Sequence, residues 1–90
     1  MRTVLVTGAN RGIGLEFVKQ YASDDDQVIA ICRNDVYTDE LKIISKKNNI
    51  LIKLADMSDF QSIDLLQNEL SGIPIDIIIN NAGVFGPKAQ

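Results

Sequence analysis

The chain has 90 residues, of which 46% are hydrophobic and 23% are charged, and its formal net charge is −3. A chain of this length forms at most one small domain, and its acidic balance lacks the basic surface that nucleic-acid binding needs. It has no histidine, which removes the commonest general base and the imidazole metal ligands. Its single cysteine, Cys32, fits a reducing compartment, and no signal peptide or membrane-spanning apolar run is apparent. We therefore expect a soluble, cytoplasmic protein.

Residues 3–14 read TVLVTGANRGIG and predict a strand, a glycine turn and the start of a helix. The first five residues are uncharged and mostly β-branched or aliphatic, as in a strand buried on both faces. The glycines at positions 8, 12 and 14 allow a tight turn and let backbone N–H groups approach a phosphate, which the following helix N-terminus also favours. This order predicts a nucleotide-phosphate site, and an ordinary strand–turn–helix connection is the alternative.

The first helix is expected to run from Ile13 to Ala22, with one apolar stripe formed by Ile13, Phe17 and Tyr21 and by Val18 and Ala22 beside them. Three consecutive aspartates at positions 24–26 then end it. Adjacent carboxylates can bind a cation, but no other ligands converge on them in the sequence. We therefore interpret this run as a solvated turn.

The second expected strand, residues 28–32, is continuously apolar, and the residues after it bear on cofactor choice. In a dinucleotide-binding fold, an acidic residue here bonds the ribose 2′-hydroxyl of NAD, whereas a nearby arginine accommodates the 2′-phosphate of NADP. This chain has Cys32 followed by Arg33, and Arg11 in the glycine loop adds a second guanidinium, a group that pairs bidentately with phosphate. NADP is favoured over NAD, with Asp35 keeping NAD open and ordinary surface arginines as the alternative.

Residues 34–49 predict a short helix around Leu41 and Ile44, followed by a third strand at 50–54. Lys53 interrupts the apolar run of that strand, which indicates a less buried strand at an edge of the sheet.

Residues 58–61 fit a capping box with Ser58 as N-cap and Gln61 at the third helical position. The helix that follows is expected to bury one stripe of side chains and to stop at Gly72 and Pro74; the stripe comprises Phe60, Ile63, Leu66 and Leu70. A fourth strand is expected at 75–79. Four apolar strands alternating with helices predict an α/β fold with a parallel sheet and right-handed crossovers.

With Thr7 in front of it, the glycine loop reads T-G-A-N-R-G-I-G, and N-N-A-G follows the fourth strand at residues 80–83. Together these motifs resemble the classical short-chain dehydrogenase/reductase family. The resemblance implies a Rossmann-like, doubly wound parallel sheet with its first four strands in the order 3-2-1-4 and about three helices. It covers nearly the whole chain but only the N-terminal part of a single NAD(P)-binding domain, so we expect residues 1–90 to be a truncated or partial chain without the C-terminal catalytic part.

The resemblance also implies which residues bind the cofactor. Asp56 matches an aspartate that contacts the adenine amino group, with the backbone of Met57 beside it, although a turn role for Asp56 is the alternative. The N-N-A-G motif supports the central sheet and lines the cofactor pocket, where small residues let the backbone close against the ribose. The expected cofactor-binding residues are Gly8, Asn10, Arg11, Gly12, Ile13, Gly14, Arg33, Asp56, Met57, Asn80, Asn81, Ala82 and Gly83.

Members of the family transfer hydride between a nicotinamide cofactor and a carbonyl or alcohol, using a tyrosine with a lysine four residues later, a serine and an asparagine. In this sequence Tyr21 is followed by Asp25 and Tyr37 by Leu41, so neither tyrosine belongs to a Tyr-x-x-x-Lys motif. We therefore assign no catalytic residue and no metal, and expect the 90 residues alone to be inactive.

Two other interpretations stay open at this point. The chain could be a non-catalytic nucleotide-binding half-domain, or one that self-associates, because isoleucines on the fourth strand would lie on an exposed edge. A homo-oligomer through that side is therefore a possible partner arrangement. A nucleotide-binding methyltransferase is disfavoured, because it needs an acidic residue where this chain has Cys32 and Arg33.

Overall fold

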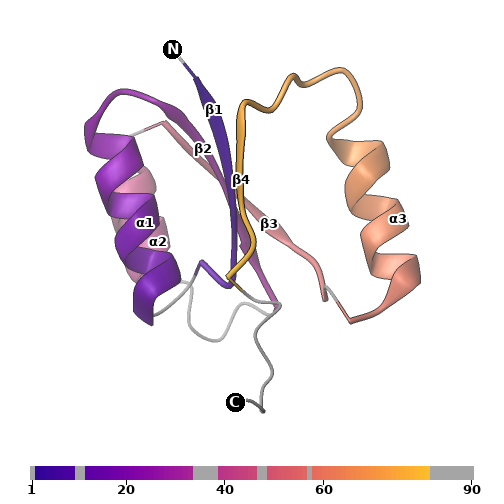
Figure 1. The fold of residues 1–90 in the computed structure, drawn as a ribbon. Helices are drawn as coiled ribbons and strands as arrows, with labels where there is room; N and C mark the ends of the chain where they lie inside the picture. The colour runs from indigo at the N-terminus through magenta and orange to yellow at the C-terminus, as the bar shows by residue number, and fades with distance from the viewer. Residues whose placement is uncertain (1, 10–11, 34–38, 47–48, 57, 82–90) are drawn as a thin grey trace.

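The computed structural model describes residues 2–9, 12–33, 39–46, 49–56 and 58–81. In this part of the chain, strands and helices alternate as β1 (Thr3–Thr7), α1 (Gly12–Ser23), β2 (Gln27–Cys32), α2 (Asp39–Ser45), β3 (Ile50–Leu54), α3 (Phe60–Glu69) and β4 (Ile77–Ile79). The four strands form one parallel sheet in the order β3-β2-β1-β4 (Figure 1). The predicted α/β fold and strand order are confirmed.

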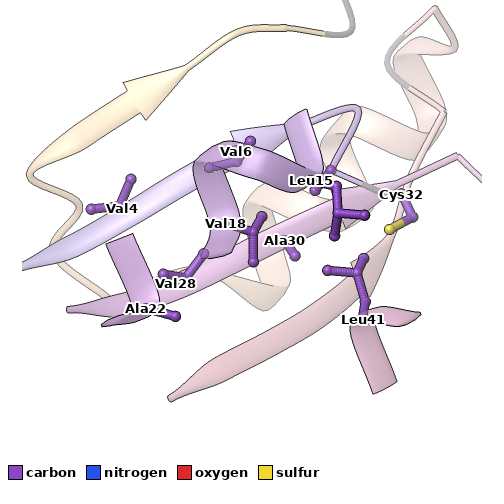
Figure 2. Packing of buried hydrophobic residues seen from close by; sticks show 10 residues of the cluster. Val4, Val6, Leu15, Val18, Ala22, Val28, Ala30, Cys32 and Leu41 are labelled. Atoms are coloured by element: carbon purple, nitrogen blue, oxygen red, sulfur yellow. The ribbon is translucent and has the colours of Figure 1, made fainter. Parts of the chain in front are cut away.

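The helices lie on both faces of the sheet, with α1 and α2 on one face and α3 on the other (Figure 1). Alternate side chains of a strand point to opposite faces. Val4 and Val28 accordingly pack in the core beneath α1 and α2, which Figure 2 shows from close by, whereas Leu5 and Ile29 belong to the core beneath α3. Burial of β1 and β2 on both faces explains their continuously apolar sequences.

The buried stripe of α1 agrees with the predicted one only in part. Val18 and Ala22 are buried against the sheet as predicted, together with Gly14 and Leu15, whereas Ile13 is 69% exposed. Phe17 and Tyr21 are only partly buried and pack at the margin of this core. The helix is therefore rotated relative to the prediction, which leaves Ile13 at the surface of the first turn.

The start of α3 also differs from the prediction. Its N-cap is Asp59, whose backbone is extended (φ −114°, ψ 116°) and whose Oδ1 accepts a hydrogen bond from the Gln61 backbone N–H at 3.1 Å. Ser58, the predicted cap, lies one residue earlier and donates its hydroxyl and its backbone N–H to Asp56 Oδ1. Phe60, in the first turn of α3, is 85% exposed, contrary to the prediction, whereas Leu66 and Leu70 are buried as predicted.

Asp26 is buried, contrary to the predicted solvated turn. Only 4% of the residue is exposed, and Arg2 Nη2 lies 2.8 Å from its Oδ2. The backbone N–H and Nε of Arg2 both donate to Asp26 Oδ1 at 3.3 Å, and the guanidinium lies over the Tyr21 ring at 5.8 Å. This ion pair ties the start of β1 to the turn between α1 and β2.

Among the described strands, β3 and β4 lie at the two edges of the sheet. The edge position of β3 confirms the prediction made from Lys53. The fourth strand begins at Ile77 rather than at residue 75. Just before it, the Asp76 carboxylate Oδ2 accepts the Thr3 N–H (2.7 Å), and the Asp76 N–H donates to the Thr3 carbonyl (2.8 Å). Among the helices that the structure describes, none has the length and apolar content needed to cross a membrane.

Candidate cofactor-binding site

The predicted site residues lie where the four strands end. Because the strands are parallel and in register, their carboxyl ends meet at one edge of the sheet. Gly8 follows β1, Arg33 follows β2, Asp56 lies just beyond β3, and Asn80 follows β4. Ligands of open α/β sheets bind at this edge, where the strand order reverses. Here the reversal lies between β1 and β4.

The structure places eight of the expected residues at or beside this edge: Gly8, Gly12, Ile13, Gly14, Arg33, Asp56, Asn80 and Asn81. Asn10, Arg11, Met57, Ala82 and Gly83 lie outside the described residues.

Gly14, Gly8 and Asn81 form one tightly packed unit. A Cβ added to Gly14 would overlap the Gly8 carbonyl oxygen and would lie 2.8 Å from the Gly8 carbonyl carbon and 2.9 Å from Asn81 Nδ2. The Asn81 amide donates to the same Gly8 carbonyl at 3.3 Å. The absent side chain at Gly14 therefore lets α1 start against the end of β1, and Asn81 fixes the turn from the β4 side.

Gly12 has a different role, because it lies next to open space. Its φ is +60°, a left-handed conformation that favours glycine, and a Cβ added there would have no atom within 4 Å. Gly8 has the same φ of +60°. The structure thus leaves space beside Gly12 at the N-terminus of α1, and the N–H groups and positive dipole end of a helix N-terminus suit an anion such as a pyrophosphate. The exposed side chain of Ile13 lies at the same end of the helix.

Thr7 joins the ends of β1 and β4, a role that the sequence analysis did not assign to it. Its hydroxyl lies 3.4 Å from the Ile79 carbonyl oxygen and 3.2 Å from Asn80 Oδ1, and the residue is 2% exposed. A buried hydroxyl needs such partners. The polar residue at the end of an otherwise apolar strand was the available signal.

Arg33 and Asp56 face each other across the ends of β2 and β3. Arg33 Nε lies 3.9 Å from Asp56 Oδ2, with side chains that are 76% and 38% exposed. Asp56 Oδ1 accepts from the Ser58 hydroxyl at 2.6 Å and from the Ser58 N–H at 2.9 Å. These hydrogen bonds, assisted by the charge of Arg33, hold the pKa of Asp56 below its usual value, so its carboxylate is charged at neutral pH. Ser58, which the sequence predicted as a helix cap, is the residue that holds Asp56 in place.

Cys32 precedes Arg33 but does not belong to the site surface. Its side chain is fully buried in the core beneath α1 and α2 (Figure 2), and burial raises the pKa of the thiol to about 11. A neutral, buried thiol is neither a nucleophile nor a hydrogen-bond acceptor of any strength. Arg33 is therefore the polar group that the end of β2 presents.

A hollow of about 340 Å³ lies between α3 and the sheet and reaches the same edge. Its walls are mainly apolar and include Leu5, Leu66 and Ile78, while Thr7 and Asn80 contribute the polar groups next to the site. The hollow thus continues from the end of β1 and β4 along the α3 face of the sheet.

Comparison with known proteins places the chain among dehydrogenases. The model of the short chain dehydrogenase family matches residues 2–90. The short-chain dehydrogenase/reductase atnB of Arthrinium sp is 35% identical over 86 residues, which cover 91% of this chain and 32% of that protein. Among solved structures, the menthone neomenthol reductase of Mentha piperita has a TM-score of 0.79 at 32% identity, covering 92% of this chain and 32% of that chain.

A second solved structure, a carbonyl reductase of Pseudomonas aeruginosa PAO1 in complex with NADP, has a TM-score of 0.85 at 28% identity. The match covers 98% of this chain and 41% of that one. The chain thus spans about a third of the length of the curated relatives it matches.

Proposed function

This chain belongs to the short-chain dehydrogenase family, and on that premise we propose that it is the cofactor-binding segment of an oxidoreductase that transfers hydride between NADP(H) and a carbonyl or alcohol substrate. The observation that carries the proposal is the convergence of Gly8, Gly14 and Asn81 at the strand-order reversal, beside the open N-terminus of α1. A dinucleotide pyrophosphate is the anion that this arrangement fits.

The preference for NADP rests on Arg33. Its guanidinium is exposed at the end of β2, where the fold brings the adenosine ribose, and a planar guanidinium pairs well with a phosphate. The buried Cys32 before it carries no charge that would repel a 2′-phosphate. The relative from P. aeruginosa was solved with NADP, which supports the same choice.

The hydride transfer is proposed for the whole protein and not for particular residues among these 90. The sequence has no Tyr-x-x-x-Lys motif, and we assign no catalytic residue. A non-catalytic nucleotide-binding or self-associating half-domain is less favoured, because the family model covers residues 2–90 and its members are dehydrogenases. Self-association through the exposed Ile78 of β4 and a cytoplasmic location stay predictions.

The test is the substitution Arg33→Asp. The dissociation constants for NADPH and NADH are measured by titrating each with the protein and following the fluorescence of the reduced nicotinamide. We expect the Kd for NADPH to rise about tenfold or more, because a carboxylate replaces the partner of the 2′-phosphate, and the Kd for NADH to change by less than about twofold.

Lys46→Asp is the matched control, because it reverses an exposed charge just after α2, before the amino end of β3 and thus away from the carboxyl ends of the strands. It should leave both constants unchanged. Equal losses for NADPH and NADH in Arg33→Asp would remove the role given to Arg33, and absence of binding by the unmodified protein would refute the proposed function.

A further inference from the structure

The ion pair between Arg33 and Asp56 bears on how strongly the site discriminates between the two nicotinamide dinucleotides. In the part of the chain that the structure describes, Asp56 is the ion-pair partner of Arg33. The inference below rests on the proposed function, because it assumes that Arg33 faces the 2′-position of the adenosine ribose. The second residue is Asp56, which lies beside Arg33 and is not itself given a contact with the phosphate.

Hydrogen bonds hold Asp56 in place at one carboxylate oxygen and at its backbone. Both hydrogen bonds from Ser58 go to Oδ1, and the Asp56 backbone N–H donates to Ser62 Oγ at 2.8 Å. Oδ2 is left as the oxygen that faces Arg33 Nε. The carboxylate therefore stays beside the guanidinium as a fixed charge.

The length of the contact decides what this charge does. At 3.9 Å, Nε and Oδ2 are too far apart for a hydrogen bond, so Asp56 does not fix the direction of the guanidinium. It acts through its charge, which offsets that of Arg33. An approaching 2′-phosphate, which carries about −1.5 to −2 charges at neutral pH, meets a pair with almost no net charge instead of a free cation.

We propose that Asp56 weakens the preference of this site for 2′-phosphorylated dinucleotides by neutralising Arg33. Asp56 is thus a specificity-determining residue that reduces the difference between the dissociation constants for NADH and NADPH. The adenine contact expected for Asp56 affects both dinucleotides equally, because both carry the same adenine. The ratio of the two dissociation constants therefore isolates the effect on the phosphate.

The experiment measures Kd for NADPH and NADH in the unmodified protein and in Asp56→Asn, which keeps the size of the side chain and removes its charge. The ratio of Kd for NADH to Kd for NADPH should rise about threefold, as expected for an exposed charge pair, and the rise should shrink in high salt. In an Arg33→Gln background, the same substitution should change the ratio less.

Glu69→Gln is the matched control. This substitution also removes one exposed carboxylate, which pairs with Lys53 at 3.4 Å. Glu69 is the last residue of α3, however, whereas Asp56 lies before the first turn of that helix, at the opposite end. It should leave the ratio unchanged. Ser58→Ala serves as a second variant if Asp56→Asn does not fold: it loosens the carboxylate without removing it, and should raise the ratio about 1.5-fold to twofold.

Three results would overturn the inference while leaving the proposed function intact. An unchanged ratio with equal shifts for both dinucleotides would make Asp56 an adenine contact or a turn residue only. A lower ratio would mean that Asp56 orients Arg33 for the phosphate. An equal effect of Asp56→Asn with and without Arg33 would show that Asp56 does not act through it. Failure of the unmodified protein to bind either dinucleotide would overturn both.

Discussion

Replacing Gly14 with alanine tests whether close contact between α1 and the end of β1 builds the site. Alanine is about 1 kcal/mol better than glycine in a helix interior, so helix propensity alone predicts a more stable protein. The structure predicts the reverse, because the added Cβ would overlap the Gly8 carbonyl oxygen and would lie 2.8 Å from its carbon. These are backbone atoms, which cannot rotate away as a flexible side chain can.

The size of the expected stability loss follows from how far α1 must shift. To admit one methyl group, α1 has to shift away from β1, which loosens the packing of Leu15 and Val18 on the sheet. Overpacking of this kind costs about 1–3 kcal/mol and occasionally more. Because the overlap is with backbone, we take a cost at the upper end and subtract the helix-propensity gain, which leaves a net loss of about 2 kcal/mol.

The assay is urea unfolding followed by circular dichroism, with thermal unfolding as a second measurement. A loss of about 2 kcal/mol should lower the Tm of a chain of this size by about 10 °C. Gly12→Ala and Gly72→Ala are the controls, since both glycines have positive φ (+60° and +85°) but no atom within 4 Å of an added Cβ. Each should lose only about 1 kcal/mol, from backbone strain.

A Gly14→Ala variant that is as stable as the unmodified protein, or more stable, would contradict the close contact between α1 and the end of β1. An equal loss of stability in the two controls would contradict it as well, because strain and not close contact would then explain the loss.

Two further predictions concern buried groups away from the site. Hydrogen bonding from the Arg2 side chain lowers the pKa of Asp26 from 3.8, so the stabilisation by charged Asp26 is complete above that value and is lost as the pH falls through the lower pKa of the folded state. Asp26→Asn should therefore show a smaller fall in the free energy of unfolding between pH 5 and pH 2 than the unmodified protein. Identical pH profiles would contradict the role of the ion pair. Burial raises the pKa of Cys32 to about 11, so iodoacetamide should alkylate it far more slowly at pH 7.5 in the folded protein than in urea, as followed by mass spectrometry; equal rates would show that the core beneath α2 opens readily.

Most of the fold could be predicted from the sequence because its signals are local. The strands β1 and β2 are runs of apolar residues bounded by turns, and the glycines at the end of β1 and the start of α1 predict the turn that joins them. The strand order came from the family resemblance and not from the residues themselves. The edge position of β3 could be predicted from one residue, Lys53, because a charge inside a strand indicates partial exposure.

The errors arose where a distant residue or a competing partner decides the structure. Asp26 looked like one of three solvated aspartates, and nothing near it in sequence points to Arg2, its partner 24 residues away. Ser58 matched a capping box, but Asp56 competes for its hydroxyl and Asp59 takes the cap. The pairing of Arg33 with Asp56 was invisible for the same reason, since it depends on the side-by-side arrangement of β2 and β3.

The central position of β1 has a consequence for the order in which the sheet can assemble. On the ribosome β1 is made first, and β2 can pair with one of its edges once about 24 further residues have followed. Its other edge must wait for Asp76, whose carboxylate bonds Thr3 across 73 residues. Closing that longer loop costs about 1 kcal/mol more in chain entropy than closing the shorter one. A nascent chain can therefore hold β1, β2 and β3 together while one side of β1 is still open to water, and the two bonds between Thr3 and Asp76 join the β4 segment to this sheet afterwards.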